Sequence, residues 1–219
     1  MSAHSGAFFT FEGVDGCGKT TQLARLADRL QAAGYDVVRA QEPGGTRVGR
    51  EIRRILLDAA STDLRPLPEA LLYFASRAQN VEEIILPALA KGSIVLADRF
   101  TDASMAYQGY GRGLGEEIVM ALDRLACRGL QPDLTFLIDI DIETSLWRAL
   151  TRNSGGRPNE SRMERESADF HERVRAGYLE IAARNPSRVR IIDGRKTPDE
   201  VADEIWSAAG SFLAARRVR

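Results

Sequence analysis

The segment from Gly13 to Thr20, GVDGCGKT, constrains the fold of this chain more than any other. An apolar run at 7–13 precedes it, and apolar side chains with helical spacing follow at 20–34. In this setting the pattern G-x-x-x-x-G-K-[ST] predicts a phosphate-binding loop, because its glycines let successive backbone N–H groups turn inward around an anion. The alternative, a glycine-rich turn that binds nothing, requires the pattern and its setting to coincide by chance. We therefore expect nucleotide phosphates at this turn.

Within this loop each polar residue has an expected role. Lys19 supplies a compact charge for the β- and γ-phosphates, and the Thr20 hydroxyl is a ligand for Mg²⁺. Asp98 closes the apolar run at 93–99 and is the expected second carboxylate near the metal, although strand ends often carry polar turn residues. The residues expected to contact ATP in this loop are Gly13, Val14, Asp15, Gly16, Cys17, Gly18, Lys19, Thr20 and Thr21.

The apolar pattern along the chain predicts an α/β fold. Five short apolar runs have the near-continuous hydrophobicity of strands that are covered on both faces. They are residues 7–13, 36–42, 93–99, 134–140 and 188–194. Segments with helical periodicity alternate with them: 20–34, 46–58, 68–92, 115–129, 143–152, 168–184 and 197–217. We predict a three-layer P-loop NTPase fold, a five-stranded parallel sheet with helices on both faces, in a single domain over 1–219.

Two glycine-rich polar segments, 108–117 and 152–162, are expected to be mobile loops, the second within a lid at about 148–165.

Composition excludes several other classes of protein. The formal net charge of −1 argues against general nucleic-acid binding. No apolar run approaches 18 residues, and the N-terminal residues lack the pattern of a secretory signal. Two cysteines, Cys17 and Cys127, fit a reducing cytoplasm rather than a disulfide framework. His4 and His171 have no evident partner in the sequence, and we expect both at the surface.

Four further segments narrow the choice of phosphate acceptor. They are EPGGT (42–46), YFASR (73–77), DRFTDASMAYQGYGRG (98–113) and the arginine-rich stretch 148–165. With the phosphate loop, these segments make the chain closely similar to the thymidylate kinases, nearly from end to end. The resemblance implies transfer of the γ-phosphoryl group of ATP to dTMP with Mg²⁺, in a cytoplasmic homodimer with no nucleic-acid or membrane partner.

The acceptor phosphate is expected to meet two arginines, because a guanidinium fork matches phosphate oxygens. The resemblance places Arg53 and Arg99 in this role, although Arg53 could also be a solvated helix charge. It places the carboxylate of Asp15 beside the sugar and phosphate of the acceptor.

The base is expected on the helix that carries YFASR. Tyr73 precedes Arg77 by one helical turn, so the two share a face, and the neighbouring Phe74 is then a core residue. The resemblance implies that Tyr73 stacks on thymine and that Arg77 donates to its carbonyl. It adds contacts to the base or sugar from Ser104, Tyr107 and Gln108, with Tyr107 disfavouring a ribose hydroxyl.

The phosphate loop has no arginine of its own, which makes the chain similar to the bacterial type that supplies arginines from the lid. In that type Arg148 and Arg152 contact ATP, and Arg162 is the best match for the catalytic lid arginine. The resulting catalytic set is Lys19, Asp15, Arg99 and Arg162.

Two other functions are compatible with a phosphate loop. One is another phosphate-loop kinase, acting on a nucleoside, a different monophosphate or a small hydroxylated metabolite. A kinase for a nucleoside would have to deprotonate a hydroxyl and would need a carboxylate base, for which Glu12 or Asp15 could serve. A monophosphate acceptor needs none, because its second pKa of about 6 leaves it largely dianionic at pH 7. A non-catalytic ATP-binding module is the other alternative.

Overall fold

The computed structural model describes residues 5–153 and 162–217. Its strands form one five-stranded parallel sheet in the order β2-β3-β1-β4-β5. The strands are β1 (Ala7–Glu12), β2 (Val37–Gln41), β3 (Ile94–Asp98), β4 (Leu134–Asp139) and β5 (Val189–Asp193). All five predicted strands are confirmed, and so is the predicted fold class.

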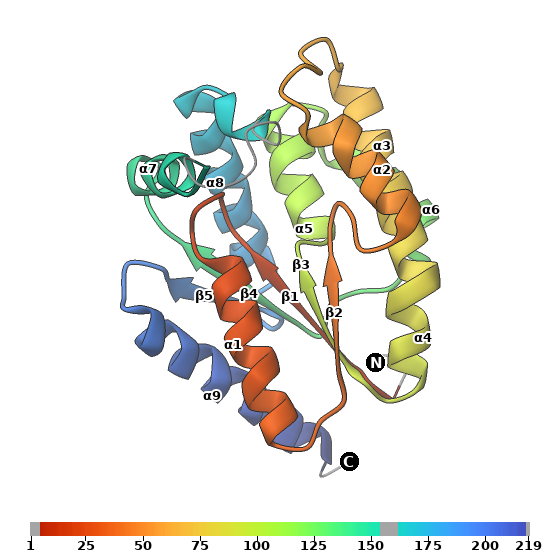
Figure 1. Cartoon of the computed structure of the whole chain (residues 1–219), viewed down its shortest axis with the longest axis vertical. Coiled ribbons are helices and arrows are strands. Elements are labelled where there is room, and N and C mark those ends of the chain that lie inside the picture. Colours follow the sequence, from red (N-terminus) through yellow and green to blue (C-terminus); the bar gives the residue numbers. More distant parts are fainter. Residues whose placement is uncertain (1–4, 154–161, 218–219) are drawn as a thin grey trace.

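Helices cover the sheet on both faces (Figure 1). They are α1 (Lys19–Ala32), α2 (Arg47–Leu57), α3 (Pro66–Asn80), α4 (Leu86–Ala90), α5 (Thr101–Ser104), α6 (Glu116–Cys127), α7 (Ile142–Asn153), α8 (Ala168–Arg184) and α9 (Pro198–Arg217). Two π-helical segments, η1 (Val81–Ile85) and η2 (Met105–Gly111), and a short 3₁₀ turn, η3 (Met163–Arg165), join them. Among the described residues, no helix is both long enough and apolar enough to cross a membrane.

The central strand explains why both faces need helices. Phe8 and Phe9 point to opposite faces of β1, and neither is exposed to solvent. Phe8 packs edge-on against Phe100, with ring centroids 5.0 Å apart, whereas Phe9 packs against Phe212 of α9 at 5.5 Å. Such a strand is stable only in the middle of a sheet that is covered on both sides.

The register of the sheet brings the chemical groups to one edge. Phe11 of β1 is aligned with Asp98 of β3, so the loops that follow these two strands leave the sheet side by side. In a parallel sheet this carboxyl edge, next to the first strand, is where ligands bind.

Only part of the segment 108–117 is the loop that its glycines predicted: residues 112–115 lie outside any helix or strand, and their mobility stays a prediction. Residues up to Gly111 continue η2, most of them are buried, and η2 packs against α8. A Cβ built on Gly111 would lie 2.7 Å from the ring of Phe170, so the glycine is needed for close packing. The other predicted loop lies mostly in 154–161, outside the described residues, and its mobility stays a prediction.

The predicted helix over 68–92 begins earlier, at Pro66, and is continuous through α3, η1 and α4. The wide π turn precedes Pro87, which has no N–H to donate to the previous turn.

Candidate active site

One cavity of about 660 Å³ opens at the carboxyl edge of the sheet. This volume lies within the usual range for small-molecule sites, roughly 300–1,000 Å³. Residues from the phosphate loop, the ends of β2 and β3, helices α2, α3, α5 and α7, and segments η2 and η3 border it. Fifteen predicted site residues are among them: Asp15, Gly16, Gly18, Lys19, Thr20, Thr21, Arg53, Tyr73, Arg77, Asp98, Arg99, Ser104, Tyr107, Gln108 and Arg148.

The phosphate loop has the backbone that an anion cradle requires. Gly13, Gly16 and Gly18 all have positive φ, and α1 begins directly after them at Lys19. A Cβ on Gly13 would lie 2.4 Å from the carbonyl oxygen of Ile138, so only glycine fits there. The Lys19 ammonium donates to the carbonyl oxygens of Gly13 and Val14, at 3.0 and 2.8 Å. The cation is thus held inside the loop, where phosphate oxygens would replace the carbonyl partners.

Two oxygen groups suited to a divalent cation lie together beside this loop. The Thr20 hydroxyl donates to Asp98 Oδ2 at 2.8 Å, and both residues border the cavity. Hydroxyl and carboxylate oxygens are the donors that Mg²⁺ prefers, and in kinases it takes its other ligands from phosphates and water. The donor set therefore fits the predicted metal.

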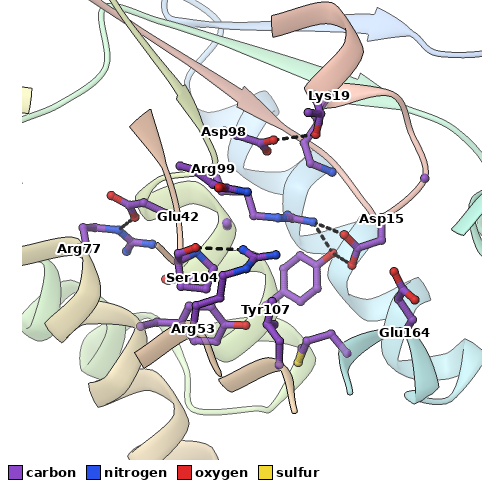
Figure 2. Close-up of a pocket in the computed structure, with 18 of the residues that line it drawn as sticks. Asp15, Lys19, Glu42, Arg53, Arg77, Asp98, Arg99, Ser104, Tyr107 and Glu164 are labelled. Atoms are coloured by element: carbon purple, nitrogen blue, oxygen red, sulfur yellow. Dashed lines mark hydrogen bonds and ion pairs between the residues drawn. The ribbon is translucent and has the colours of Figure 1, made fainter. Parts of the chain in front are cut away.

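Arg99 projects into the cavity, and its guanidinium lies beside the Lys19 ammonium, because both groups donate to the carbonyl oxygen of Gly13 (Figure 2). Its Nη1 donates to Gly13 O and to Tyr178 Oη, both at 3.0 Å. Its Nη2 donates to Asp15 Oδ1 at 2.7 Å and to Tyr107 Oη at 3.1 Å. The guanidinium is thus fixed in direction before a ligand arrives.

Asp15 is ionised in this setting. Burial by itself would raise its pKa, but the charges of Arg99 and Lys19 outweigh burial and hold the pKa well below its usual value. Its carboxylate therefore neutralises part of the positive charge that Arg99 and Lys19 bring to the cavity.

The far end of the cavity holds neutral and cationic donors (Figure 2). Arg77 is 1% exposed, and its Nε donates to Glu42 Oε2 at 2.5 Å. Nη1 of Arg77 and Oγ of Ser104 are buried without a hydrogen-bond partner among the described residues. Buried polar atoms are almost always partnered, so these two atoms mark where polar atoms of a ligand would bind.

The aromatic pair of α3 divides as predicted. Tyr73 borders the cavity. Phe74 is buried in the core, with the Arg77 guanidinium 4.6 Å above its ring. Gln108 also borders the cavity, and its side-chain amide donates to Glu69 at 3.0 Å. Arg53 reaches the cavity from α2, and its Nη1 donates to Pro43 O at 2.9 Å.

The predicted lid arginines are separated in the structure. Arg148 borders the cavity, and its Nη1 donates to Gly194 O at 3.3 Å. Arg162 is 7% exposed and pairs with Glu69 at 2.8 Å, and it is not among the residues that border the cavity. Its catalytic role stays a prediction and would require release from Glu69. The Arg152 side chain lies outside the described part of the chain.

The sequence prediction missed several residues near the cavity. Glu42, Met163 and Glu164 border it, and Tyr178 lies behind it against Arg99. Glu42 ends the run predicted as a strand at 36–42, at the carboxyl edge of the sheet, and this position is a usable signal. Tyr178 carries no such signal, because it sits in the middle of a helix far along the chain.

The surface position predicted for His171 is wrong: it is 1% exposed, on the buried face of α8, and burial lowers its pKa. His4 lies outside the described residues.

Comparisons with known proteins show similarity to one family over most of the chain. The family model described as "Thymidylate kinase" matches residues 11–205. A protein named "Thymidylate kinase" from Trichlorobacter lovleyi is 51% identical over 208 residues, covering 94% of this chain and 98% of that protein. One of the same name from Citrifermentans bemidjiense is 53% identical, covering 86% of this chain and 84% of its own length. A third, from Solidesulfovibrio magneticus, is 47% identical, covering 94% of this chain and 100% of its own length.

Proposed function

Because this chain belongs to the thymidylate kinase family, which phosphorylates dTMP to dTDP with ATP, we propose that its cavity holds the two nucleotides head to head. The observation that supports this proposal is that Lys19, on the phosphate loop, and Arg99, at the end of β3, border one cavity and converge on the carbonyl oxygen of Gly13, each at 3.0 Å, where the two phosphate groups would meet. ATP lies with its phosphates in the loop, and the dTMP phosphate lies at Arg99 and Arg53.

The transfer itself needs positioning and neutralisation of charge more than acid–base catalysis. The acceptor oxygen belongs to a dianion with a second pKa of about 6, so no side chain has to remove a proton from it. Lys19 neutralises charge on the transferred group, while Arg99 holds the acceptor phosphate against its repulsion from ATP. Thr20 and Asp98 would hold Mg²⁺, which would supply positive charge to neutralise the phosphates of ATP.

The pyrimidine base occupies the far end of the cavity in this proposal. Arg77 Nη1 and Ser104 Oγ, which lack partners among the described residues, face carbonyl and imide groups of the base. Tyr73 forms the flat wall, and Tyr107 lies along the sugar.

A panel of acceptors tests this function. Release of ADP is measured with Mg-ATP and dTMP, thymidine or no acceptor. We expect ADP release with dTMP and none with thymidine. Activity with thymidine would indicate a nucleoside kinase with Asp15 as its base, since Glu12 has no exposed surface and does not border the cavity. ATP binding without acceptor-dependent ADP release would indicate a binding module.

The protein also carries an apolar surface suited to a second copy of the chain. Helices α2 and α3 pack together, as do α3 and α6, on one side of the molecule (Figure 1). Large hydrophobic side chains are exposed on these three helices: Val48, Ile55, Leu67, Leu71, Ile118 and Leu125. Such clustering is characteristic of an interface, and we propose a homodimer through it.

Light scattering tests the dimer: we expect the mass of a dimer for the parent and a shift toward the monomer for Leu71→Glu. A monomeric parent would contradict the proposal. The cytoplasmic location likewise stays a proposal, based on the free cysteines Cys17 and Cys127.

A further inference from the structure

The backbone at Arg99 adopts a conformation that must be held in place. Its φ is 74°, in the left-handed region that side-chain-bearing residues rarely adopt. This turn directs the side chain from the end of β3 into the cavity. Its backbone N–H donates to Phe11 O on β1, at 3.1 Å. A relaxed backbone would turn the guanidinium away from the acceptor position.

Glu12 holds the other side of this turn. It is the last residue of β1, it has no exposed surface, and its Oε1 accepts from the backbone N–H of Phe100 at 2.7 Å. That N–H directly follows the strained residue, so its hydrogen bond fixes the peptide that leaves Arg99.

The same carboxyl also reaches the guanidinium. Glu12 Oε2 accepts from the Tyr178 hydroxyl at 2.9 Å, and that hydroxyl accepts from Arg99 Nη1 at 3.0 Å. One side chain therefore contacts both ends of the same arginine, its backbone directly and its charged group through a tyrosine. Burial and the neighbouring Asp102 raise the pKa of Glu12 to about 8, although Arg99, Tyr178 and the Phe100 N–H favour its charged form.

We propose that Glu12 is a positioning residue for the acceptor site, which fixes Arg99 in its strained turn and, through Tyr178, fixes the direction of its guanidinium. The inference rests on the proposed function of Arg99 in gripping the acceptor phosphate. Glu12 touches no substrate and acts only through Arg99.

Tyr178→Phe is the sharpest test, because it removes one hydroxyl and keeps the ring. We expect the KM for dTMP to rise about fivefold, because the hydroxyl that links Glu12 to the Arg99 guanidinium is lost. The KM for ATP should stay within about twofold of the parent. Glu12→Ala removes both the contact with the Phe100 N–H and the contact with the Tyr178 hydroxyl. It should therefore raise the KM for dTMP further, by about tenfold or more. Glu12→Gln keeps an acceptor for Phe100 and should restore most of the loss.

A double-mutant cycle separates positioning from a general structural role. In an Arg99→Ala background, Tyr178→Phe should no longer change the KM for dTMP, because the group it positions is gone. Thr10→Val is the matched control: Thr10 is a buried polar residue of the same strand, bonded to Thr135 Oγ1 at 2.8 Å. It should lower the melting temperature without changing the ratio of the two KM values.

Two results would overturn the inference. One is an undiminished effect of Tyr178→Phe in the Arg99→Ala background, and the other is an equal change in both KM values. If Arg99→Ala itself leaves the KM for dTMP unchanged, the role of Arg99 fails first and the inference falls with it. Should Glu12→Ala fail to fold, Tyr178→Phe and the cycle decide alone.

Discussion

The two halves of the cavity are built in different ways. The donor half, where we propose that ATP binds, is one contiguous segment, Gly13 to Thr21, whose backbone N–H groups and single lysine would form the anion site, and the acceptor half is where we propose that dTMP binds. The acceptor half is made of side chains from separate segments, including Arg53 on α2, Arg77 on α3 and Arg99 after β3. A backbone site depends on local geometry, whereas a side-chain site depends on the packing of the whole sheet edge.

This comparison predicts that damage to the donor half is the more severe for turnover. Lys19→Ala should lower kcat by about 10³-fold or more, because no other residue supplies that charge inside the loop. Steady-state kinetics at saturating substrates measure it, with unchanged circular dichroism as proof of folding. Lys91→Ala, the same change at an exposed site, is the control. If Lys19→Ala turned over as fast as the parent, the phosphate loop would not be the site that holds ATP.

Arg99→Ala should damage the acceptor half selectively. We expect kcat/KM for dTMP to fall about 10²-fold, with the dissociation constant for ATP within about threefold of the parent. Isothermal titration with a non-hydrolysable ATP analogue supplies the second value. The control is Arg128→Ala, because Arg128 is the other non-glycine residue with positive φ among the described residues, at 54°, and it lies at the surface. Equal loss for both nucleotides would erase the distinction between the halves.

Ser104→Ala sharpens the comparison within the acceptor half. The hydroxyl is buried without a partner in the described protein, so its removal should raise the KM for dTMP by about tenfold or less and leave the melting temperature unchanged. Ser93→Ala should do the reverse, because the Ser93 hydroxyl is bonded to Asp36 away from the cavity. A fall in stability without a change in KM would make Ser104 structural.

The smallest expected effect is a dependence of stability on pH. Burial lowers the pKa of His171 in the folded protein, so the unfolded chain takes up the proton first as the pH falls through about 6.5. When the pH is lowered from 7.5 to 5.5, the melting temperature of the parent should fall by roughly 2–4 °C more than that of His171→Gln.

Glu12 has the opposite effect, because its raised pKa stabilises the folded protein as the pH falls. The difference in melting temperature between parent and His171→Gln therefore reports His171 alone, since both proteins contain Glu12. Identical slopes for parent and variant would show that His171 does not stay neutral in the folded protein.

Much of this fold was predictable because its signals are local. Each strand is a short apolar run and the glycine pattern lies within nine residues, so the strands, the parallel sheet and the glycine turn before α1 could all be predicted from the sequence. The segment up to Gly111 was read as a mobile loop because glycines signal flexibility locally, whereas here they allow η2 to pack against α8. His171 was misplaced for the same reason, since its burial depends on elements that are distant in the sequence.

The sequence by itself determined the parallel sheet and the glycine turn before α1, because hydrophobic periodicity and glycine spacing act between neighbouring residues. Only the tertiary structure decided which side chains share the acceptor half. Glu42 meets Arg77, Tyr178 meets Arg99, and Arg162 pairs with Glu69 across 35, 79 and 93 positions of sequence. These pairings depend on strand order and on the alignment of Phe11 with Asp98, and no residue pattern along a single segment encodes either.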